Sequence, residues 1–351
     1  CMATVTLGRT GIVAQKQAFG CLPIQRISEQ DAVYLLYKAY DGGINFYDTA
    51  RAYSDSEQKV GAAFSGMRDK VVLATKTAAQ TADTMWKDLE TSLRTLKTDY
   101  IDIYQFHNPS FCPRPGGEDG LYDAALEAKK QGKIRHISLS NHRLLVAHEA
   151  IDSGLYATLQ FPFSYLAGAQ ELELVQKCRE NHMGFIAMKG MAGGLIRDGL
   201  TASAWMQTQE GVVPIWGVQR ECELDQFLQG IREGAELTDE RRARIEQDRK
   251  ELRGGFCRGC GYCMPCPAGI EINQCARISL MIRRAPSESW LAPAMQAEME
   301  KIEHCLGCGQ CKSRCPYELD TPNLLKRNLA DYRRILAGEV STESYLRPAQ
   351  K

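Results

Sequence analysis

Short apolar runs alternate with longer amphipathic runs along the chain, and this alternation recurs eight times from Ala18 onward. Apolar runs of roughly four to eight residues bounded by turn residues are typical of buried strands. The predicted strands are residues 18–24, 44–47, 71–76, 101–107, 134–140, 158–163, 184–189 and 212–218. Eight strand–helix units in succession predict an α/β protein built on a (β/α)8 TIM barrel.

The amphipathic run after each strand predicts a helix. The first helix is opened by Ser28, with Asp31 three residues on as a capping pair. In the third helix, Trp86, Leu89 and Leu93 keep the spacing of one helical face. The remaining predicted helices are 56–64, 82–96, 120–130, 144–152, 169–180, 201–209 and one that begins near Glu221. Residues 3–18 predict a short hairpin or cap ahead of the barrel.

Beyond the eighth unit the character of the sequence changes. Residues 236–254 mix acidic and basic side chains and predict a solvated linker helix rather than a nucleic-acid surface. Residues 255–330 are rich in cysteine, and residues 331–351 predict a helix with a polar tail. We therefore predict a barrel domain (1–235), a linker helix (236–254), an iron–sulfur domain (255–330) and a C-terminal helix and tail (331–351).

Composition argues against several classes of partner. The 351 residues include 43 basic and 43 acidic side chains, and this zero net charge disfavours a broad surface for nucleic acid or anionic membrane. No apolar run approaches the roughly 18 residues needed to cross a bilayer, and the N-terminus lacks a signal-peptide pattern. We expect a cytoplasmic protein that acts on a small molecule, without nucleic-acid or membrane partners.

Eight of the 14 cysteines lie in two short runs. The first, C-x2-C-x2-C-x2-C-P, comprises Cys257, Cys260, Cys263 and Cys266, and the second, C-x2-C-x2-C-x3-C-P, comprises Cys305, Cys308, Cys311 and Cys315. Three thiolates at this spacing can hold three corners of an iron–sulfur cubane, and in two-cluster ferredoxins the fourth cysteine of each run ligates the other cluster. We therefore predict two [4Fe-4S] clusters. The predicted ligand sets are Cys257, Cys260, Cys263 and Cys315, and Cys305, Cys308, Cys311 and Cys266.

Two alternatives concern these cysteines. Zinc is the other candidate metal, although it prefers separated pairs of cysteines to triplets. The first run is one residue shorter than usual before its Cys-Pro, so Cys275 is an alternative to Cys266. We predict helices at 270–282 and 291–302, and burial as small hydrophobic side chains for the scattered Cys21, Cys112, Cys178 and Cys222.

Polar residues stand at or just past the ends of six predicted strands: Asp48, Lys76, His107, Asn141, Gln160 and Lys189. The C-terminal ends of barrel strands carry the catalytic groups, but polar residues also occur there because strand ends meet solvent. For any one residue the two explanations are equally good. Together the set contains the groups that carbonyl reduction requires, with Tyr53 in the loop beyond Asp48.

Hydride reduction of a carbonyl needs a proton donor for the developing alkoxide and a positive charge beside it. A tyrosine has a reference pKa near 10, which is too high for rapid proton exchange at neutral pH without a neighbouring cation. Lys76 is the candidate cation, and Asp48 would hold it in place and charged. His107 would orient the carbonyl or polarise the phenol of Tyr53.

The stretches DTARAYSDSE, ATK, QFHNP, SLSNH, LQFPF and AMKGMAGG resemble the aldo-keto reductases, in that order and spacing, over residues 3–235. The resemblance implies a catalytic tetrad of Asp48, Tyr53, Lys76 and His107, with Tyr53 as the general acid and base. It also implies that the nicotinamide carboxamide contacts Ser140, Asn141 and Gln160. The loops after strands seven and eight would hold the rest of the nucleotide, through Lys189, Gly190, Gly193, Gly217 and Arg220.

The eighth strand departs from the pattern of that family. The family usually has a proline-glycine pair and several polar and basic residues that grip the 2′-phosphate, where this chain has Ile215-Trp216-Gly217-Val218-Gln219-Arg220. Arg220 is the one obvious positive charge in this stretch, so the sequence leaves NADH and NADPH equally open. Trp216 either packs in the core or stacks on a ligand.

The resemblance extends to the C-terminal part, because the spacing of the cysteines and the helical pattern between them are similar to an α-helical two-cluster ferredoxin. The whole chain looks like the ferredoxin-fused branch of the aldo-keto reductases. We predict an NAD(P)-dependent oxidoreductase from a low-oxygen setting, whose clusters serve structure or exchange electrons with a protein partner. The alternative is a non-catalytic redox sensor or electron carrier. We find no flavin motif that would connect two-electron hydride transfer with one-electron clusters.

Overall fold

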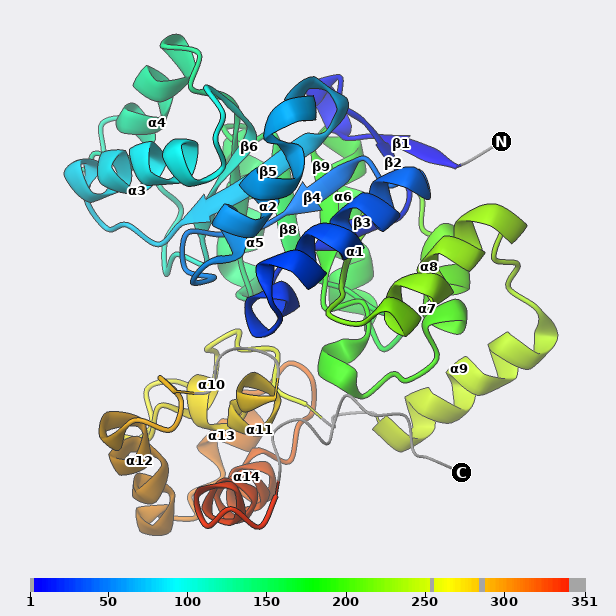
Figure 1. Ribbon diagram of the computed structural model, residues 1–351. Coiled ribbons are helices and arrows are strands. Elements are labelled where there is room, and N and C mark those ends of the chain that lie inside the picture. The colour runs from blue at the N-terminus through cyan, green and yellow to red at the C-terminus, as the bar shows by residue number, and fades with distance from the viewer. Residues whose placement is uncertain (1–2, 253–255, 284–287, 341–351) are drawn as a thin grey trace. The chain divides into compact units, whose positions relative to one another are not determined.

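The computed structural model describes residues 3–252, 256–283 and 288–340 (Figure 1). The chain forms two compact units, of which the first ends at Glu246 and the second contains Gly193–Leu195 and the residues from Gln247 onward. None of the helices in the described ranges is long and apolar enough to cross a membrane.

The first unit is a closed barrel of eight parallel strands, in the order β10-β3-β4-β5-β6-β7-β8-β9. The strands are β3 (Ala18–Gly20), β4 (Phe46–Asp48), β5 (Val72–Thr77), β6 (Ile101–His107), β7 (Ile134–Ser140), β8 (Thr158–Pro162), β9 (Gly184–Met188) and β10 (Val212–Gly217). The helices of this unit are α1 (Glu29–Asp41), α2 (Ser56–Phe64), α3 (Ala82–Thr95), α4 (Leu121–Lys130), α5 (Leu144–Ser153), α6 (Ala169–Glu180), α7 (Gly199–Gln207) and α8 (Glu221–Glu233). The predicted barrel fold is confirmed.

An N-terminal hairpin fills one end of the barrel. It pairs β1 (Thr4–Thr6) with β2 (Val13–Gln15), as the cap predicted for residues 3–18 suggests. Its Leu7 and Ala14 are fully buried in one apolar cluster with inward-facing strand residues such as Phe46 and Ile103. The backbone N–H of Arg9 donates to His182, which precedes β9, so the hairpin lies at the N-terminal ends of the strands. The C-terminal ends of the strands form the opposite rim, where TIM barrels carry their catalytic groups.

Two predicted strands are wrong in their extent. The first strand ends at Gly20 rather than residue 24, because Pro23 starts a short 3-10 helix (Pro23–Arg26). The second strand is Phe46–Asp48 rather than residues 44–47, so Asp48 is its last residue. The first helix begins as predicted, since the Ser28 side chain accepts a hydrogen bond from the N–H of Asp31 at 3.1 Å.

The second unit is helical. Its elements are α10 (Ile272–Cys275), α11 (Ile278–Ile282), α12 (Pro293–Glu300), the 3-10 helix η5 (Lys301–His304), α13 (Gln310–Ser313) and α14 (Thr321–Leu336), preceded by the charged helix α9 (Asp239–Leu252). Ile270, Ile278, Met299 and Leu325 belong to its apolar core. The charged linker helix and the absence of strands from the described residues beyond 255 agree with the predicted helical organisation.

Three boundaries in this unit differ from the predictions. The helix predicted at 270–282 is two short helices, because the turn at Ala276 and Arg277 lets both Cys275 and Ile278 pack inward. The helix predicted at 291–302 ends at Glu300 and continues as η5. The last helix, α14, begins at Thr321, where Pro322 suits a first turn, and so crosses the predicted boundary at residue 330. The polar tail at 341–351 lies outside the described residues.

Candidate active site and cluster-binding region

Three of the predicted catalytic residues lie at the C-terminal ends of adjacent parallel strands. Asp48 is the last residue of β4, Lys76 the last but one of β5, and His107 the last of β6. The strands pair in the order β4, β5, β6, which brings these ends to one rim. Tyr53 lies in the loop between β4 and α2. The structure therefore brings the four residues together.

Asp48 and Lys76 form a buried ion pair. Each residue is about 1% exposed, and Nζ of Lys76 lies 2.5 Å from Oδ2 of Asp48. The same ammonium donates to the carbonyl of Thr49 at 2.8 Å. Burial lowers the pKa of Lys76, but the neighbouring Asp48 and Tyr53 outweigh it and leave the pKa above its ordinary value. Lys76 is therefore a permanent cation in the resting site.

Two glutamine side chains complete the environment of the Asp48 carboxylate. Nε2 of Gln105 donates to Oδ1 at 3.0 Å, and Nε2 of Gln160 donates to the same oxygen at 3.1 Å. Sequence reasoning missed Gln105, although it precedes His107 by two residues and so points to the same face of β6. The carboxylate is held on both oxygens, which fixes its rotamer.

Tyr53 lies between the cation and the imidazole. Nζ of Lys76 is 5.0 Å from the centroid of the Tyr53 ring, and the His107 ring meets it edge to face at 5.8 Å. Burial raises the pKa of Tyr53, the charge of Lys76 opposes that rise and Asp48 adds to it, so that the pKa stays above its ordinary value. The lysine is thus the group that favours the phenolate.

His107 is electrically neutral in this setting. Burial and then the positive charge of Lys76 lower its pKa to about 3. At neutral pH the imidazole therefore has one nitrogen that donates a hydrogen bond and one that accepts. Such a ring can position a substrate oxygen without competing with Lys76 for negative charge.

The loop that carries Tyr53 is anchored by residues that sequence reasoning did not single out. The N–H of Arg51 donates to the carbonyl of Lys76 at 3.0 Å, and the Arg51 guanidinium pairs with the fully buried Glu57. Glu57 also accepts from the Thr75 hydroxyl at 2.8 Å. Ser54 takes a positive φ of 41°, which turns the chain into α2. These bonds tie the loop to β5 next to Lys76.

Among the residues predicted to contact the nicotinamide, Ser140 is the last residue of β7 and Asn141 follows it, but Gln160 is the middle residue of β8 rather than its end. Asn141 is fully buried: its Nδ2 donates to the carbonyl of Pro109 and its Oδ1 accepts from the N–H of Arg143, both at 2.8 Å. Oγ of Ser140 accepts from the N–H of Asn108 at 3.3 Å. With Gln160 bound to Asp48, all three side chains are engaged within the protein.

The other predicted nucleotide residues lie in the loops after β9 and β10 or, in the case of Gly217, at the end of β10. Lys189 has a positive φ of 57°, and Gly190 is buried against Trp216, so that a Cβ there would meet the indole at 2.5 Å. Gly217 is the last residue of β10. Gly193, with a φ of 73°, belongs to the second unit. Arg220 is the N-cap of α8, and its Nε donates to Glu223 at 3.0 Å.

Trp216 is a packing residue in this structure. It is 1% exposed and stacks on Phe227 of α8, with ring centroids 4.5 Å apart and an interplanar angle of 11°. Its indole N–H donates to Gln17. The aromatic pair therefore joins β10 to α8 beneath the loop that begins with Gly190.

The eight cysteines of the two runs gather in the second unit. A small cavity is lined by one group of them together with Ile270 and Leu325; these cysteines are Cys263, Cys266, Cys305, Cys308 and Cys311. Burial, together with the neighbouring thiols of Cys257 and Cys315, raises the pKa of Cys260 to about 11. Cys315 of the second run thus lies beside the first run, and Cys266 of the first run lies beside the second.

Cys275, the alternative to Cys266, has different surroundings. It is fully buried, and burial raises its pKa to about 12, with Glu298 and Glu271 as its charged neighbours. Among the described residues, no three His, Cys, Asp or Glu side chains are grouped as tightly as a single metal ion requires.

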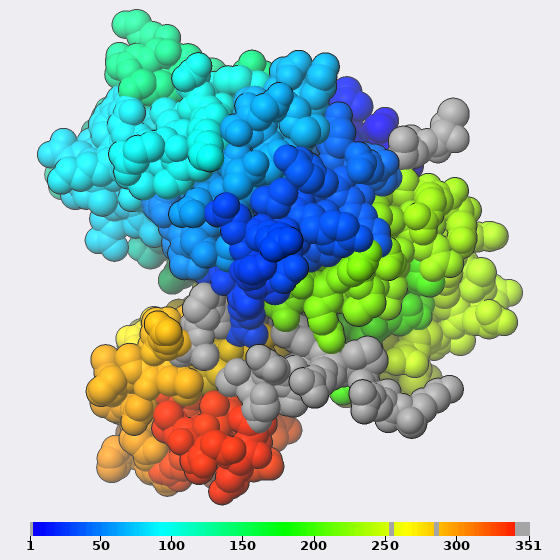
Figure 2. All heavy atoms as spheres, viewed as in Figure 1, coloured from blue at the N-terminus to red at the C-terminus, as the bar shows by residue number. Residues whose placement is uncertain are grey.

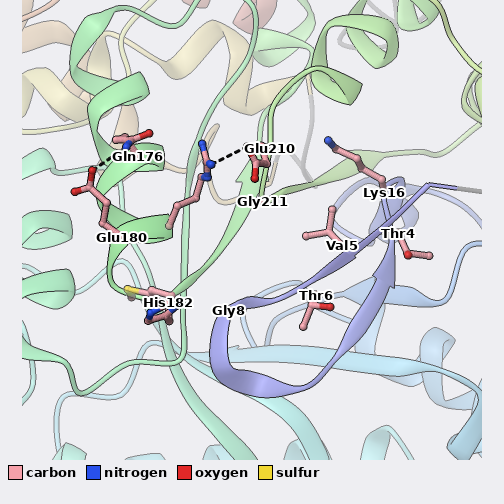
Figure 3. A pocket seen from close by; sticks show the side chains of 12 residues that line it. Thr4, Val5, Thr6, Gly8, Lys16, Gln176, Glu180, His182, Glu210 and Gly211 are labelled. Carbon is pink, nitrogen blue, oxygen red and sulfur yellow. Dashed lines mark hydrogen bonds and ion pairs between the residues drawn. The ribbon is translucent and has the colours of Figure 1, made fainter.

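A separate hollow of about 640 Å³ lies at the opposite rim of the barrel (Figure 3). One side of the hollow is formed by β1, which includes Thr4. The other side is formed by residues that precede β9 and β10, such as His182 and Glu210. Lys16 is held there by the carbonyls of Gln207 and Gln209, both at 2.7 Å. None of the predicted site residues lines this hollow.

Comparison with known proteins identifies both parts of the chain. A model of the aldo/keto reductase family matches residues 15–211, and a model of the 4Fe-4S dicluster domain matches residues 256–320. The chain is 29% identical over 220 residues to the uncharacterized oxidoreductase YrpG of Bacillus subtilis, which covers 54% of this chain and 67% of that protein. It is 34% identical over 158 residues to the 6-dehydroglucose reductase of Novosphingobium aromaticivorans, covering 38% and 50% respectively. The chain thus spans about half to two thirds of these relatives.

Solved structures agree with the barrel. The holo form of an aldo-keto reductase from Bacillus halodurans has a TM-score of 0.62 at 23% identity, covering 71% of this chain and 96% of that one, which shows the fold. An aldo-keto reductase from Klebsiella pneumoniae in complex with NADPH has a TM-score of 0.60 at 25% identity, covering 70% and 95%. The chain therefore belongs to the aldo/keto reductase family and carries a C-terminal 4Fe-4S dicluster domain.

Proposed function

We propose that the barrel exchanges hydride between a nicotinamide cofactor and a carbonyl or alcohol substrate, with Tyr53 as the general acid and base. The observation that supports this most is the place of the Lys76 ammonium. It is bonded to Asp48 and lies 5.0 Å from the ring centroid of Tyr53. A fixed cation beside a phenol favours the phenolate and so makes proton donation easier at neutral pH.

The four residues divide the work as follows. The bound nicotinamide would supply or accept the hydride. In the reducing direction, Tyr53 donates its hydroxyl proton to the substrate oxygen as negative charge develops there. Lys76 stabilises the phenolate that remains, and Asp48 keeps Lys76 protonated. The neutral His107 orients the substrate oxygen through one ring nitrogen.

The cofactor is proposed to lie across the same rim. Ser140, Asn141 and Gln160 would hold the carboxamide, and the segments after β9 and at the end of β10 would hold the phosphates through Lys189, Gly190, Gly217 and Arg220. Glycines at such a loop permit the close approach of backbone to phosphate. The NADPH bound to the Klebsiella aldo-keto reductase supports a nicotinamide cofactor in this barrel.

The second unit is proposed to hold two [4Fe-4S] clusters. The ligand sets that fit the arrangement of thiols are Cys257, Cys260, Cys263 and Cys315, and Cys305, Cys308, Cys311 and Cys266. Each cluster would carry one electron at a time, to or from a protein partner, or hold the unit together. Thiolate ligands of this kind suit a reducing compartment such as the cytoplasm.

A redox sensor that binds nicotinamide without turnover is the second candidate. The engagement of Asn141 with Pro109 and Arg143, and of Arg220 with Glu223, favours it. Those side chains must rearrange before they contact a nucleotide. An electron carrier that docks through its second unit belongs to the same non-catalytic class.

A Tyr53→Phe variant tests the enzyme. Loss of the hydroxyl should lower turnover of NAD(P)H with aldehydes and ketones by at least about 100-fold, because the proposed proton donor to the alkoxide is then missing. Nucleotide binding should persist, and it can be measured by the quenching of protein fluorescence. Tyr37→Phe is the matched control, since Tyr37 is 42% exposed on α1. If Tyr53→Phe keeps most of the activity, the acid is another group. If the parent protein binds nucleotide but reduces no carbonyl in a broad panel, the sensor is correct.

A further inference from the structure

The positions at which this barrel would receive phosphate groups are lined by protein carboxylates. TIM barrels frequently bind phosphate with the loops after their seventh and eighth strands and a helix N-terminus there. The seventh and eighth strands are β9 and β10, and α7 and α8 follow them. Asp198 caps α7, where its Oδ1 accepts from the N–H groups of Leu200 at 3.0 Å and Thr201 at 3.1 Å. A phosphate at α7 would have to displace this carboxylate.

The loop after β10 offers one arginine, and a glutamate already holds it. Nε of Arg220 lies 3.0 Å from Oε1 of Glu223, and both side chains are only partly exposed, at 32% and 25%. Glu223 is in the first turn of α8, where the helix dipole favours its negative charge. Arg220 is therefore occupied in the resting protein.

The neighbouring carboxylates and the lysine beside them do not separate Arg220 from Glu223. Glu221 and Asp225, also on α8, both pair with Lys38 of α1, at 2.5 and 2.7 Å. Figure 2 shows the blue surface of α1 beside the yellow-green surface of α8. Glu221 and Asp225 therefore share Lys38 as a cation of their own, and Arg220 stays paired with Glu223.

We infer that the Arg220–Glu223 pair makes the barrel prefer NAD(H) to NADP(H). This inference rests on the proposed nicotinamide-dependent function. A phosphate monoester carries close to two negative charges at neutral pH, and Glu223 would repel it while competing for Arg220. A ribose 2′-hydroxyl is neutral and can donate to a carboxylate, as acidic residues do for NAD in other nucleotide-binding folds. Glu223 is then a specificity-determining residue rather than a helix cap alone.

The experiment measures the dissociation constants of NADH and NADPH by fluorescence titration of the full-length protein, with 2′,5′-ADP and 5′-AMP as probes that require no turnover. The parent protein should bind NADH at least about tenfold more tightly than NADPH, and 5′-AMP more tightly than 2′,5′-ADP. Glu223→Gln removes one charge and frees Arg220. It should shift the NADPH-to-NADH affinity ratio about tenfold toward NADPH.

Two further variants test whether the shift in the affinity ratio depends on Arg220. Adding Arg220→Ala to Glu223→Gln should cancel the shift, because the gain depends on the freed guanidinium. Glu180→Gln changes the net charge equally at the opposite rim, where Glu180 pairs with Gln176, and should leave the ratio unchanged. Equal or tighter binding of NADPH by the parent protein overturns the inference, as does a Glu223→Gln ratio like the parent's. If neither nucleotide nor either probe binds, the proposed function itself fails.

Discussion

In the barrel, the ionisable groups of the site satisfy one another, whereas in the second unit the thiols surround a small cavity. Asp48 is bonded to Lys76, Gln105 and Gln160, so its charge is compensated by the chain alone. Five cysteines line a cavity whose remaining walls are mostly apolar; they are Cys263, Cys266, Cys305, Cys308 and Cys311. One site is organised by the polypeptide, and the other is suited to organisation by an inorganic group.

This difference follows from how each unit obtains its stability. A closed barrel of eight strands buries a large apolar core, and it can support a costly buried ion pair at one rim. The second unit consists of short helices, several of four or five residues, joined by cysteine-containing turns. Small units of this kind commonly need disulfides or metals to fold. Perturbing each site should therefore have different structural consequences.

The largest expected effect is the loss of a cluster ligand. Cys311→Ser removes a buried thiol from the cavity of the second unit. Purified without oxygen, the variant should contain about four irons rather than about eight, because one cluster of the proposed two is lost. The circular-dichroism signal of the second unit should melt earlier, while nucleotide binding by the barrel persists.

Cys222→Ser is the matched control for this substitution. The predicted burial of Cys222 is wrong, because this residue is exposed on α8, and it lies outside both runs. The control should leave the iron content unchanged. A full complement of iron in Cys311→Ser would show that Cys311 is not a ligand. Loss of nucleotide binding together with the cluster would show that the barrel depends on the second unit.

The next largest effect is expected from breaking the buried ion pair. Lys76→Met leaves the Asp48 carboxylate buried without its cation, which should lower the free energy of unfolding by about 3–5 kcal/mol and abolish turnover. Adding Asp48→Asn removes the stranded charge, so the double variant should recover stability but not turnover. Urea denaturation followed by fluorescence measures the first effect, and NAD(P)H oxidation measures the second.

An exposed pair provides the comparison for that result. Lys177 lies 2.7 Å from Asp152, but the side chain of Asp152 is 64% exposed. Lys177→Met should cost less than about 1 kcal/mol. If Lys76→Met is equally mild, the buried ion pair with Asp48 contributes no more to stability than an exposed pair does, and the comparison fails.

The order of elements and the meeting of the catalytic candidates follow from the sequence. Apolar periodicity gives eight strands, and parallel strands place their C-terminal ends at one rim, so Asp48, Lys76 and His107 had to be neighbours once the barrel was assumed. The cysteine spacing likewise gives the 4Fe-4S dicluster domain, because three thiols two residues apart can reach a common cluster.

Other features depend on contacts that spacing does not encode. Gln105 shares the inward face of β6 with His107, but only the packed barrel shows that its amide reaches Asp48 on β4. The bonds of Asn141 are made within an irregular loop, where no periodicity applies. Arg220 and Glu223 are three residues apart, and they face each other only because α8 begins at Glu221.

The smallest expected effect concerns the protonation of His107. Its pKa is about 3 in the folded barrel because of burial and then the charge of Lys76, against about 6.5 in an unfolded chain. Between these values the unfolded chain binds a proton that the folded barrel does not. The free energy of unfolding should therefore fall as the pH drops below about 6.5, by at most about 1.4 kcal/mol per pH unit from this residue.

His107→Asn should remove that part of the pH dependence, measured by urea denaturation at several pH values between about 7 and 5. His182→Asn is the control, because His182 is exposed at the other rim and its positive φ of 51° suits asparagine. The control should keep the slope of the parent protein. An unchanged slope in His107→Asn would mean that His107 binds its proton at the same pH in the folded barrel as in the unfolded chain. The rim would then hold a second cation beside Lys76 below about pH 6.5, and the neutral orienting role proposed for His107 would be lost there.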